Sequence, residues 1–183
     1  GAGVPVGGRV FEQGGEPGGA HGFALVVSER GNLAGPRGGV AAIGPVAETG
    51  RRRRGELAQR LGVATERPLV LVSMGGVGYG LRPQDWPPSA ELFFLVPGAG
   101  PGGRGDMAGV DEIEMPFPDL LASCDAVLTK PGYGSFVEAA CGGLAVGYLR
   151  RERWPEQDAL LAWLHAHARC IEIAEADLQR GGF

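Results

Sequence analysis

The sequence contains little lysine, histidine or cysteine, and it has no long hydrophobic run. A single lysine, Lys130, stands among 17 basic residues, and there are three histidines and three cysteines. The cysteines form no CxxC pair, so we expect neither a zinc site nor a disulfide framework, and a reducing cytoplasm fits best. No apolar run approaches the roughly 18 residues of a transmembrane helix, and no signal peptide is visible. The formal net charge of −4 argues against a nucleic-acid partner.

Glycine, in contrast, is in large excess. The chain has 34 glycines and 14 prolines in 183 residues, which is close to the composition at which disorder becomes plausible. Fifteen of the glycines fall within the first 50 residues, whereas 44% of the whole chain is hydrophobic and can build a core. We therefore predict two parts: a Gly-rich linker or remnant over residues 1–45, with short strands at 23–27 and 40–46, and a Rossmann-like domain over residues 46–183.

Short apolar runs alternate with helical patterns from residue 66 onward. Continuous apolar runs are typical of strands that are buried on both faces of a parallel sheet, and their alternation with helices predicts an α/β fold. The predicted strands are 69–73, 91–96, 112–115, 126–129, 144–149 and 170–173. The predicted helices and helical turns are 51–61, 119–123, 135–141, 155–168 and 175–180. Residues 99–109 are predicted to be a glycine-rich loop, and the run Arg51–Arg54 a solvated loop or helix start.

A glycine loop, SMGGVGYG (73–80), follows the first predicted buried strand. Its glycines Gly75, Gly76 and Gly78 would let backbone amides approach a phosphate without obstruction by a Cβ atom. A plain tight turn explains the loop equally well. The sequence matches neither a P-loop nor the GxGxxG dinucleotide fingerprint, which weakens an assignment as an NAD(P)-dependent oxidoreductase.

A second loop, TKPGYGSFVE (129–138), leads from a predicted strand into a helix. A helix start offers free amide groups to an anion, and the only lysine of the chain stands beside it. Glu138, one turn into the helix, would accept two hydrogen bonds from a ribose diol. The competing interpretation is purely structural: Ser135 caps the helix and Glu138 completes a capping box. The predicted phosphate-binding residues of this loop are Lys130, Gly132, Tyr133, Gly134 and Ser135.

A third segment, RRERWPEQ (150–157), follows the next predicted strand and ends at a helix start. Glu156 and Gln157 there would bind sugar hydroxyls. The alternative is that the acidic residue complements the helix dipole.

The motif TKPGYGSFVEAACGGLAVGYLRRERWPEQ resembles the C-terminal, donor-binding domain of GT-B glycosyltransferases of the family 28 type, which includes the N-acetylglucosaminyltransferase of peptidoglycan synthesis. It also resembles a subgroup of uncharacterised bacterial proteins and the glycosyltransferase-like half of some plant sugar kinases. The resemblance extends from about Leu69 to Ile173. It implies that the domain is the C-terminal half of a GT-B fold.

The resemblance also implies a role for each candidate residue. The first glycine loop would line the diphosphate or the interdomain cleft, and the second loop would hold the diphosphate. Glu138 would bind the ribose, and Glu156 and Gln157 would contact the donor sugar. The nucleobase would lie near Met115, Pro116 and Phe117. Lys130, Pro131 and Tyr133 depart from the pattern of the better-known members of the family.

A GT-B enzyme needs two domains, with the acceptor and usually the catalytic base on the N-terminal one. We therefore expect a UDP-sugar donor and, as partner, either an N-terminal acceptor domain or a second copy of the chain. The resemblance implies an inverting transfer without a cofactor, and the absence of a DxD motif agrees with a transfer that needs no metal. No catalytic residue is assigned. The alternative is a non-catalytic nucleotide-binding or subunit-interaction module.

Overall fold

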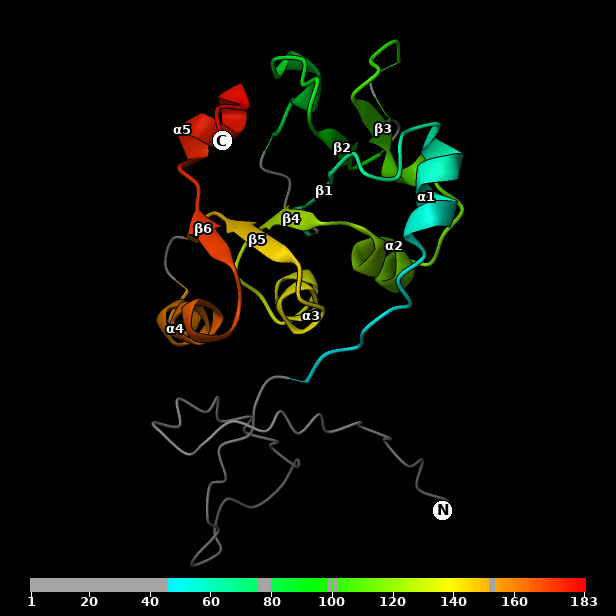
Figure 1. The fold of residues 1–183 in the computed structure, drawn as a ribbon. Coiled ribbons are helices and arrows are strands. Elements are labelled where there is room, and N and C mark those ends of the chain that lie inside the picture. Colours follow the sequence, from blue (N-terminus) through cyan, green and yellow to red (C-terminus); the bar gives the residue numbers. More distant parts are fainter. Residues whose placement is uncertain (1–45, 76–79, 99, 101, 152–153) are drawn as a thin grey trace, which may run out of the picture. The chain divides into compact units, whose positions relative to one another are not determined.

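Six parallel strands form the centre of the computed structural model (Figure 1). The structure describes residues 46–75, 80–98, 100, 102–151 and 154–183. The strands are β1 (Leu69–Ser73), β2 (Phe93–Val96), β3 (Met107–Gly109), β4 (Ala126–Thr129), β5 (Ala145–Tyr148) and β6 (Cys170–Glu172). The helices of the described part are α1 (Arg54–Leu61), α2 (Phe117–Ser123), α3 (Ser135–Cys141), α4 (Gln157–His167) and α5 (Glu175–Arg180), with 3-10 helices η1 (Pro83–Asp85) and η2 (Val110–Glu112).

The strand order is β3-β2-β1-β4-β5-β6, with every neighbouring pair parallel. From β1 the chain moves outward to β2 and β3, and from β4 it moves outward in the opposite direction to β5 and β6. The strand order therefore reverses between β1 and β4. In open α/β sheets, this is where the crevice that binds ligands forms, beyond the carboxyl ends of the strands. The predicted α/β, Rossmann-like parallel sheet flanked by helices is confirmed.

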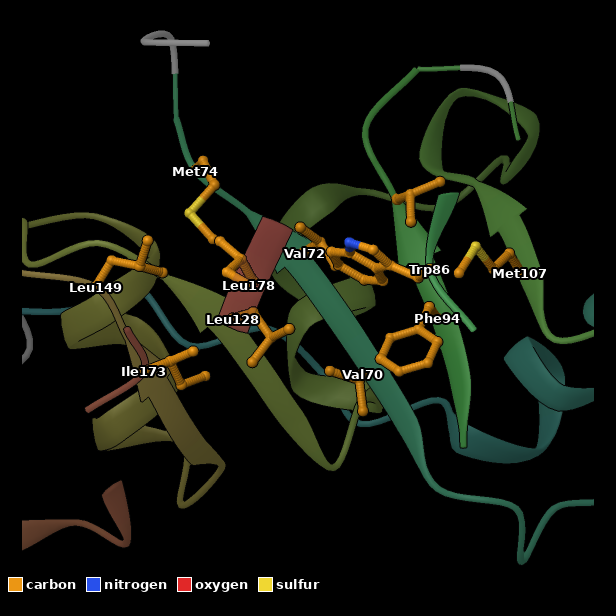
Figure 2. Close-up of a cluster of buried hydrophobic side chains, with 11 residues drawn as sticks. Val70, Val72, Met74, Trp86, Phe94, Met107, Leu128, Leu149, Ile173 and Leu178 are labelled. Carbon is orange, nitrogen blue, oxygen red and sulfur yellow. The ribbon is translucent and has the colours of Figure 1, made fainter. Parts of the chain in front are cut away.

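The two faces of the sheet are covered differently. Helices α1 to α4 lie on one side, and α5 lies on the other side together with the segment that contains η1 (Figure 1). On that second side, Val70 and Val72 of β1 pack in one buried cluster with Trp86 and with Leu178 of α5 (Figure 2). The ring of Trp86 meets the ring of Phe94 edge-on at a centroid distance of 5.4 Å. A loop side chain therefore takes the place of a crossover helix over β1 and β2.

The third strand is the main correction to the predicted elements. We expected a strand at 112–115 and a loop at 99–109, but β3 occupies Met107–Gly109 inside that loop and residues Val110–Glu112 form η2. Met107 is buried against the Trp86 cluster and pairs with Phe94 of β2, so a long-range contact fixes this strand. The other five strands lie within their predicted runs, although α4 begins at Gln157 instead of Pro155.

Several predictions concern residues that the structure does not describe. The short strands expected at 23–27 and 40–46, the Gly-rich segment 1–45, Gly76 and Gly78 lie outside the described residues, except for Val46. The described elements belong to one unit, Ala47–Phe183. Within the described ranges, no helix combines the length and the apolar character required to cross a membrane.

Candidate functional site

The ends of β1 and β4 are tied together by hydroxyl groups. The Thr129 hydroxyl donates to the backbone carbonyl of Ser73 at 2.7 Å, which links the last residues of the two strands. The hydroxyl oxygens of Ser73 and Ser135 lie 3.2 Å apart, within hydrogen-bond distance. Ser135 is the first residue of α3, so the loop 130–134 is fixed at both of its ends against β1. The loops after β1 and β4 therefore meet at the position where the strand order reverses.

Lys130 lies directly against the backbone of the first glycine loop. A Cβ atom built on Gly75 would lie 3.5 Å from Cε and 3.7 Å from Nζ of Lys130. Gly75 has a φ angle of +65°, in the left-handed region that favours glycine. Partial burial, and then the nearby positive charge of Arg151, lower the pKa of Lys130 below its usual value. The single ammonium group of the chain is thus held at the switch point beside exposed backbone.

A cavity of about 510 Å³ lies beyond the ends of β1 and β2. Ser73 and Gly75 line one part of it, and Leu81, Val110 and Phe117 line another. The Phe117 side chain is 39% exposed, an unusual position for a large aromatic residue. Among the described residues that line this cavity, Phe117 is the only member of the predicted nucleobase segment Met115–Phe117. The cavity is therefore continuous with the loop that contacts Lys130.

Aromatic and charged side chains from the loops after β4 and β5 meet near Lys130. The rings of Tyr133 and Trp154 pack edge-to-face with centroids 6.0 Å apart. The Arg151 guanidinium lies over the Trp154 ring at 4.6 Å from the centroid, and its Nη1 donates to the Pro131 carbonyl at 3.4 Å. Burial and a hydrogen bond with Glu156 raise the pKa of the Tyr133 hydroxyl. The loops after β4 and β5 thus form one connected surface.

The remaining predicted residues are in different surroundings. Gln157 is buried, and its side-chain oxygen accepts a hydrogen bond from the backbone N–H of Arg151. Glu138 is half-buried on α3, and burial together with the negative charge of Glu48 raises the pKa of its carboxyl. Glu138 is therefore beside another carboxylate, a costly arrangement that a hydrogen-bond donor from a ligand would relieve.

The capping interpretation of Ser135 and Glu138 is wrong. The residue at the N-cap of α3 is Gly134, and no side chain makes a cap hydrogen bond there. The Ser135 hydroxyl instead contacts Ser73. A Cβ atom built on Gly134 would have no described atom within 4 Å. On that side, therefore, no described residue would keep a ligand away from the backbone of Gly134.

The structure brings five of the candidate residues close to one another and places two further side chains beside them. Gly75, Lys130 and Ser135 gather at the switch point, and Tyr133 and Glu156 lie on the adjoining surface. Sequence reasoning missed Arg151 and Trp154, although both stand in the charged segment that supplied Glu156 and Gln157. Their position just after the predicted strand 144–149 is the sequence signal that could have identified them as candidate site residues. Among the described residues, no three His, Cys, Asp or Glu side chains form a group that could hold a metal ion.

No model of a known protein family matches the chain. A curated relative, L-arabinokinase from Arabidopsis thaliana, is 25% identical in an alignment 141 residues long, and the match covers 71% of this chain and 13% of the relative. The chain thus spans only about an eighth of the length of that relative. The match agrees with the resemblance to plant sugar kinases, whereas the family 28 resemblance has no counterpart among the family models. The chain is a distant homologue of part of a sugar-related enzyme and has a Rossmann-like α/β fold.

Proposed function

We propose that residues 46–183 are the nucleoside-diphosphate-sugar-binding domain of an inverting, metal-independent glycosyltransferase of the GT-B type. One observation carries the proposal: the only lysine of the chain lies against Gly75 at the point where the strand order reverses. An ammonium group next to accessible backbone is suited to a phosphate group. The distant sugar-kinase relative and the sequence resemblance described above support sugar-nucleotide chemistry over other phosphate ligands.

The surroundings of Lys130 suggest how a donor would lie. With the diphosphate at Lys130 and Ser135, the nucleobase would occupy the cavity lined by Phe117 and Leu81, which is partly apolar and adjoins Gly75. Glu138, one turn along α3, would accept hydrogen bonds from the ribose diol. The glycosyl group would extend toward Tyr133 and Glu156, whose side chains are exposed. In this pose the donor would contact the predicted subsites at Lys130, Ser135, Glu138, Tyr133 and Glu156.

In the proposed reaction, the acceptor displaces the nucleoside diphosphate at the anomeric carbon. The bond between that carbon and the phosphate oxygen breaks, so negative charge develops on the leaving diphosphate. Lys130 would stabilise that charge, and its fixed position against Gly75 lowers the reorganisation required. The acceptor and the base that deprotonates it would come from an N-terminal acceptor domain or a second copy of the chain.

Calorimetric titration of the chain with UDP, GDP, UDP-N-acetylglucosamine and uridine tests the donor site. We expect UDP to bind and Glu138→Gln to weaken UDP and uridine alike by about tenfold, because both ligands contain the ribose diol. Glu48→Gln is the matched control, since it removes the neighbouring carboxylate but no ribose contact, and we expect affinities within twofold of wild type. Absence of binding at millimolar ligand would refute the proposal.

A non-catalytic nucleotide-binding module is the second candidate. Both described histidines, His165 and His167, lie in the last turn of α4, where His165 contacts Tyr148 and Cys170 and His167 contacts the carbonyl of Trp163. None of these contacts is with a residue of the loop 130–134, so no described histidine is assigned the role of general base. Nucleotide binding without sugar transfer, even when a separately expressed acceptor domain is supplied, would favour this candidate.

A further inference from the structure

Arg151 is fixed in place on two sides. Its guanidinium stacks on Trp154 at 4.6 Å, and its Nη1 donates to the carbonyl of Pro131, the residue that follows Lys130. Its backbone N–H donates to the buried side chain of Gln157. Because the side chain is already held by these groups, little conformational entropy would be lost when it binds a ligand.

The contacts of Arg151 differ from those of its neighbour Arg150. Arg150 forms ion pairs with Asp158 at 3.2 Å and Glu172 at 3.0 Å, so carboxylates offset its charge. Within the described part of the chain, Arg151 contacts an aromatic ring and a carbonyl group. Neither of these groups carries a negative charge that would neutralise its guanidinium. The adjacent arginines therefore have different electrostatic surroundings.

Lys130 and Arg151 place two positive charges on the same surface. Arg151 Nη1 lies 3.4 Å from the carbonyl oxygen of Pro131, the residue after Lys130, and after burial the positive charge of Arg151 contributes to lowering the pKa of Lys130. Repulsion between like charges is unfavourable in the free protein and is relieved when an anion binds between the cations. A diphosphate carries a phosphoryl group for each cation, whereas a monophosphate satisfies only one.

We propose that Arg151 is the second phosphate-binding cation of this site and that, together with Lys130, it selects diphosphate over monophosphate ligands. That the ligand contains a nucleoside rests on the proposed function. That the two cations bind its pyrophosphate does not. Lys130 contacts one phosphoryl group and Arg151 the other, which in a nucleotide sugar bears the glycosyl group. The packed rings of Tyr133 and Trp154 orient the guanidinium and border the space where that glycosyl group lies.

Calorimetric titration of the full chain with UDP, UMP and inorganic pyrophosphate tests this inference. We expect Arg151→Gln to weaken UDP and pyrophosphate binding at least tenfold and UMP binding less than threefold. Arg151→Lys, which keeps the charge but loses the planar fork, should cause a smaller loss. Arg150→Gln is the matched control and should leave all three affinities within twofold. Thermal unfolding of each variant shows whether it is folded.

The outcomes separate this inference from the proposed function. If the wild type binds UDP and Arg151→Gln binds it equally well, or loses UDP and UMP to the same extent, the inference is wrong and the donor site stands. If the wild type binds pyrophosphate through Arg151 but no nucleotide, the inference stands and the donor site is wrong. Failure to bind either ligand would contradict both. If Arg151→Gln does not fold, the comparison of Arg151→Lys with wild type decides the matter.

Discussion

The basic residues at the amino ends of the strands differ in their partners from Lys130 and Arg151 at the carboxyl ends, where Arg150 is paired with carboxylates. At the amino-terminal edge, Arg54, Arg67 and Arg104 donate to backbone carbonyls. Arg54 also forms an ion pair with Asp125, and Arg104 donates to the carboxylate of Asp106. At the carboxyl-terminal edge, Lys130 and Arg151 lie near each other, close enough for their charges to repel. We propose that the arginines at the amino ends of the strands stabilise the fold, whereas Lys130 and Arg151 at the carboxyl ends serve ligand binding.

The Arg104–Asp106 pair shows the structural use clearly. The Arg104 guanidinium donates to both carboxylate oxygens of Asp106, at 2.8 and 2.6 Å, and to the carbonyls of Trp86 and Pro87. Asp106 also accepts from the Ser89 backbone N–H at 2.8 Å. The pair therefore holds the loop that carries Trp86 over the sheet, in a half of the molecule where loops replace crossover helices.

Loss of Arg54 should have the largest effect on stability. Its side chain, 11% exposed, donates to the carbonyls of Thr65 and Arg67 and pairs with Asp125 at 3.3 Å. One of its nitrogens, Nη1, is buried without a hydrogen-bond partner among the described residues. The cost of burying that nitrogen offsets part of the stabilisation that the other contacts provide. We expect Arg54→Ala to lower the free energy of unfolding by about 2–3 kcal/mol, measured by urea denaturation, and to leave UDP affinity unchanged.

Arg51→Ala is the control for this substitution. Arg51 is exposed, and its contact with Asp119 is made by its backbone N–H, which alanine retains. The free energy of unfolding of Arg51→Ala should stay within about 0.5 kcal/mol of the wild-type value. If Arg54→Ala instead weakened UDP binding while keeping full stability, the proposed division between the two edges would be wrong.

Acid should remove the contribution of the Arg104–Asp106 pair. The hydrogen bond from Arg104 outweighs the opposing effect of burial and lowers the pKa of Asp106 from 3.8 to about 2. Because the folded-state value lies below the unfolded one, the stability from this carboxylate is complete above pH 4 and is lost as the pH falls through about 2. The shift corresponds to about 2 kcal/mol. Urea denaturation from pH 5 to pH 2 should show a smaller loss for Asp106→Asn than for wild type, and equal losses would contradict the assignment.

Lys130→Ala should lower ligand affinity and leave stability nearly unchanged, whereas Arg54→Ala should lower stability and leave ligand affinity unchanged. We expect UDP affinity to fall about tenfold, equivalent to about 1.4 kcal/mol, and uridine affinity to change little, because only UDP has phosphate groups. Stability should change by less than about 0.5 kcal/mol, since relief of the repulsion from Arg151 offsets lost packing. Lys130→Arg, which keeps the charge, is the calorimetric control. Equal losses for UDP and uridine would refute the phosphate role.

Gly75→Ala should have the smallest effect. Its φ angle of +65° would strain alanine by about 1 kcal/mol, but the new Cβ would make only ordinary contact with Lys130. We expect a lower melting temperature and less than a threefold change in UDP affinity. Gly55→Ala is the control, because Gly55 lies in α1 with open space around its Cβ position and alanine favours a helix. Gly55→Ala should raise the melting temperature. A lower melting temperature for Gly55→Ala would show that helix propensity does not determine whether this substitution stabilises the protein.

Five of the six strands could be located from the sequence, and continuous apolar runs mark four of these, β1, β2, β4 and β5. LVLVS and AVLT are buried on both faces, and such runs are recognisable without knowledge of their partners. The sequence MAG of β3 has no such pattern, because its burial depends on pairing with β2 and on packing against Trp86. Strand order likewise depends on contacts between distant segments, so the switch point could not be derived from local patterns.

The arginines show a similar limit for the site. The run Arg51–Arg54 was predicted to be a solvated loop or helix start, and α1 does begin at Arg54, but the Arg54 side chain is largely buried against carbonyl groups. Lys130 could be singled out because it is the only lysine. Arg151 is one of many arginines, and contacts that the sequence does not reveal distinguish it from Arg150: Arg151 stacks on Trp154 and bonds to Pro131, whereas Arg150 pairs with two carboxylates.

Amide hydrogen exchange of the full chain, with and without saturating UDP, tests the central claim most directly. If the β1–β4 switch point binds the diphosphate, peptides that contain Ser73–Gly75 and Lys130–Ser135 should exchange more slowly with UDP. Peptides at the opposite edge, which contain Arg54 and Asp125, should be unaffected. Protection at that opposite edge, or no change around Lys130 while UDP is bound, would contradict the account.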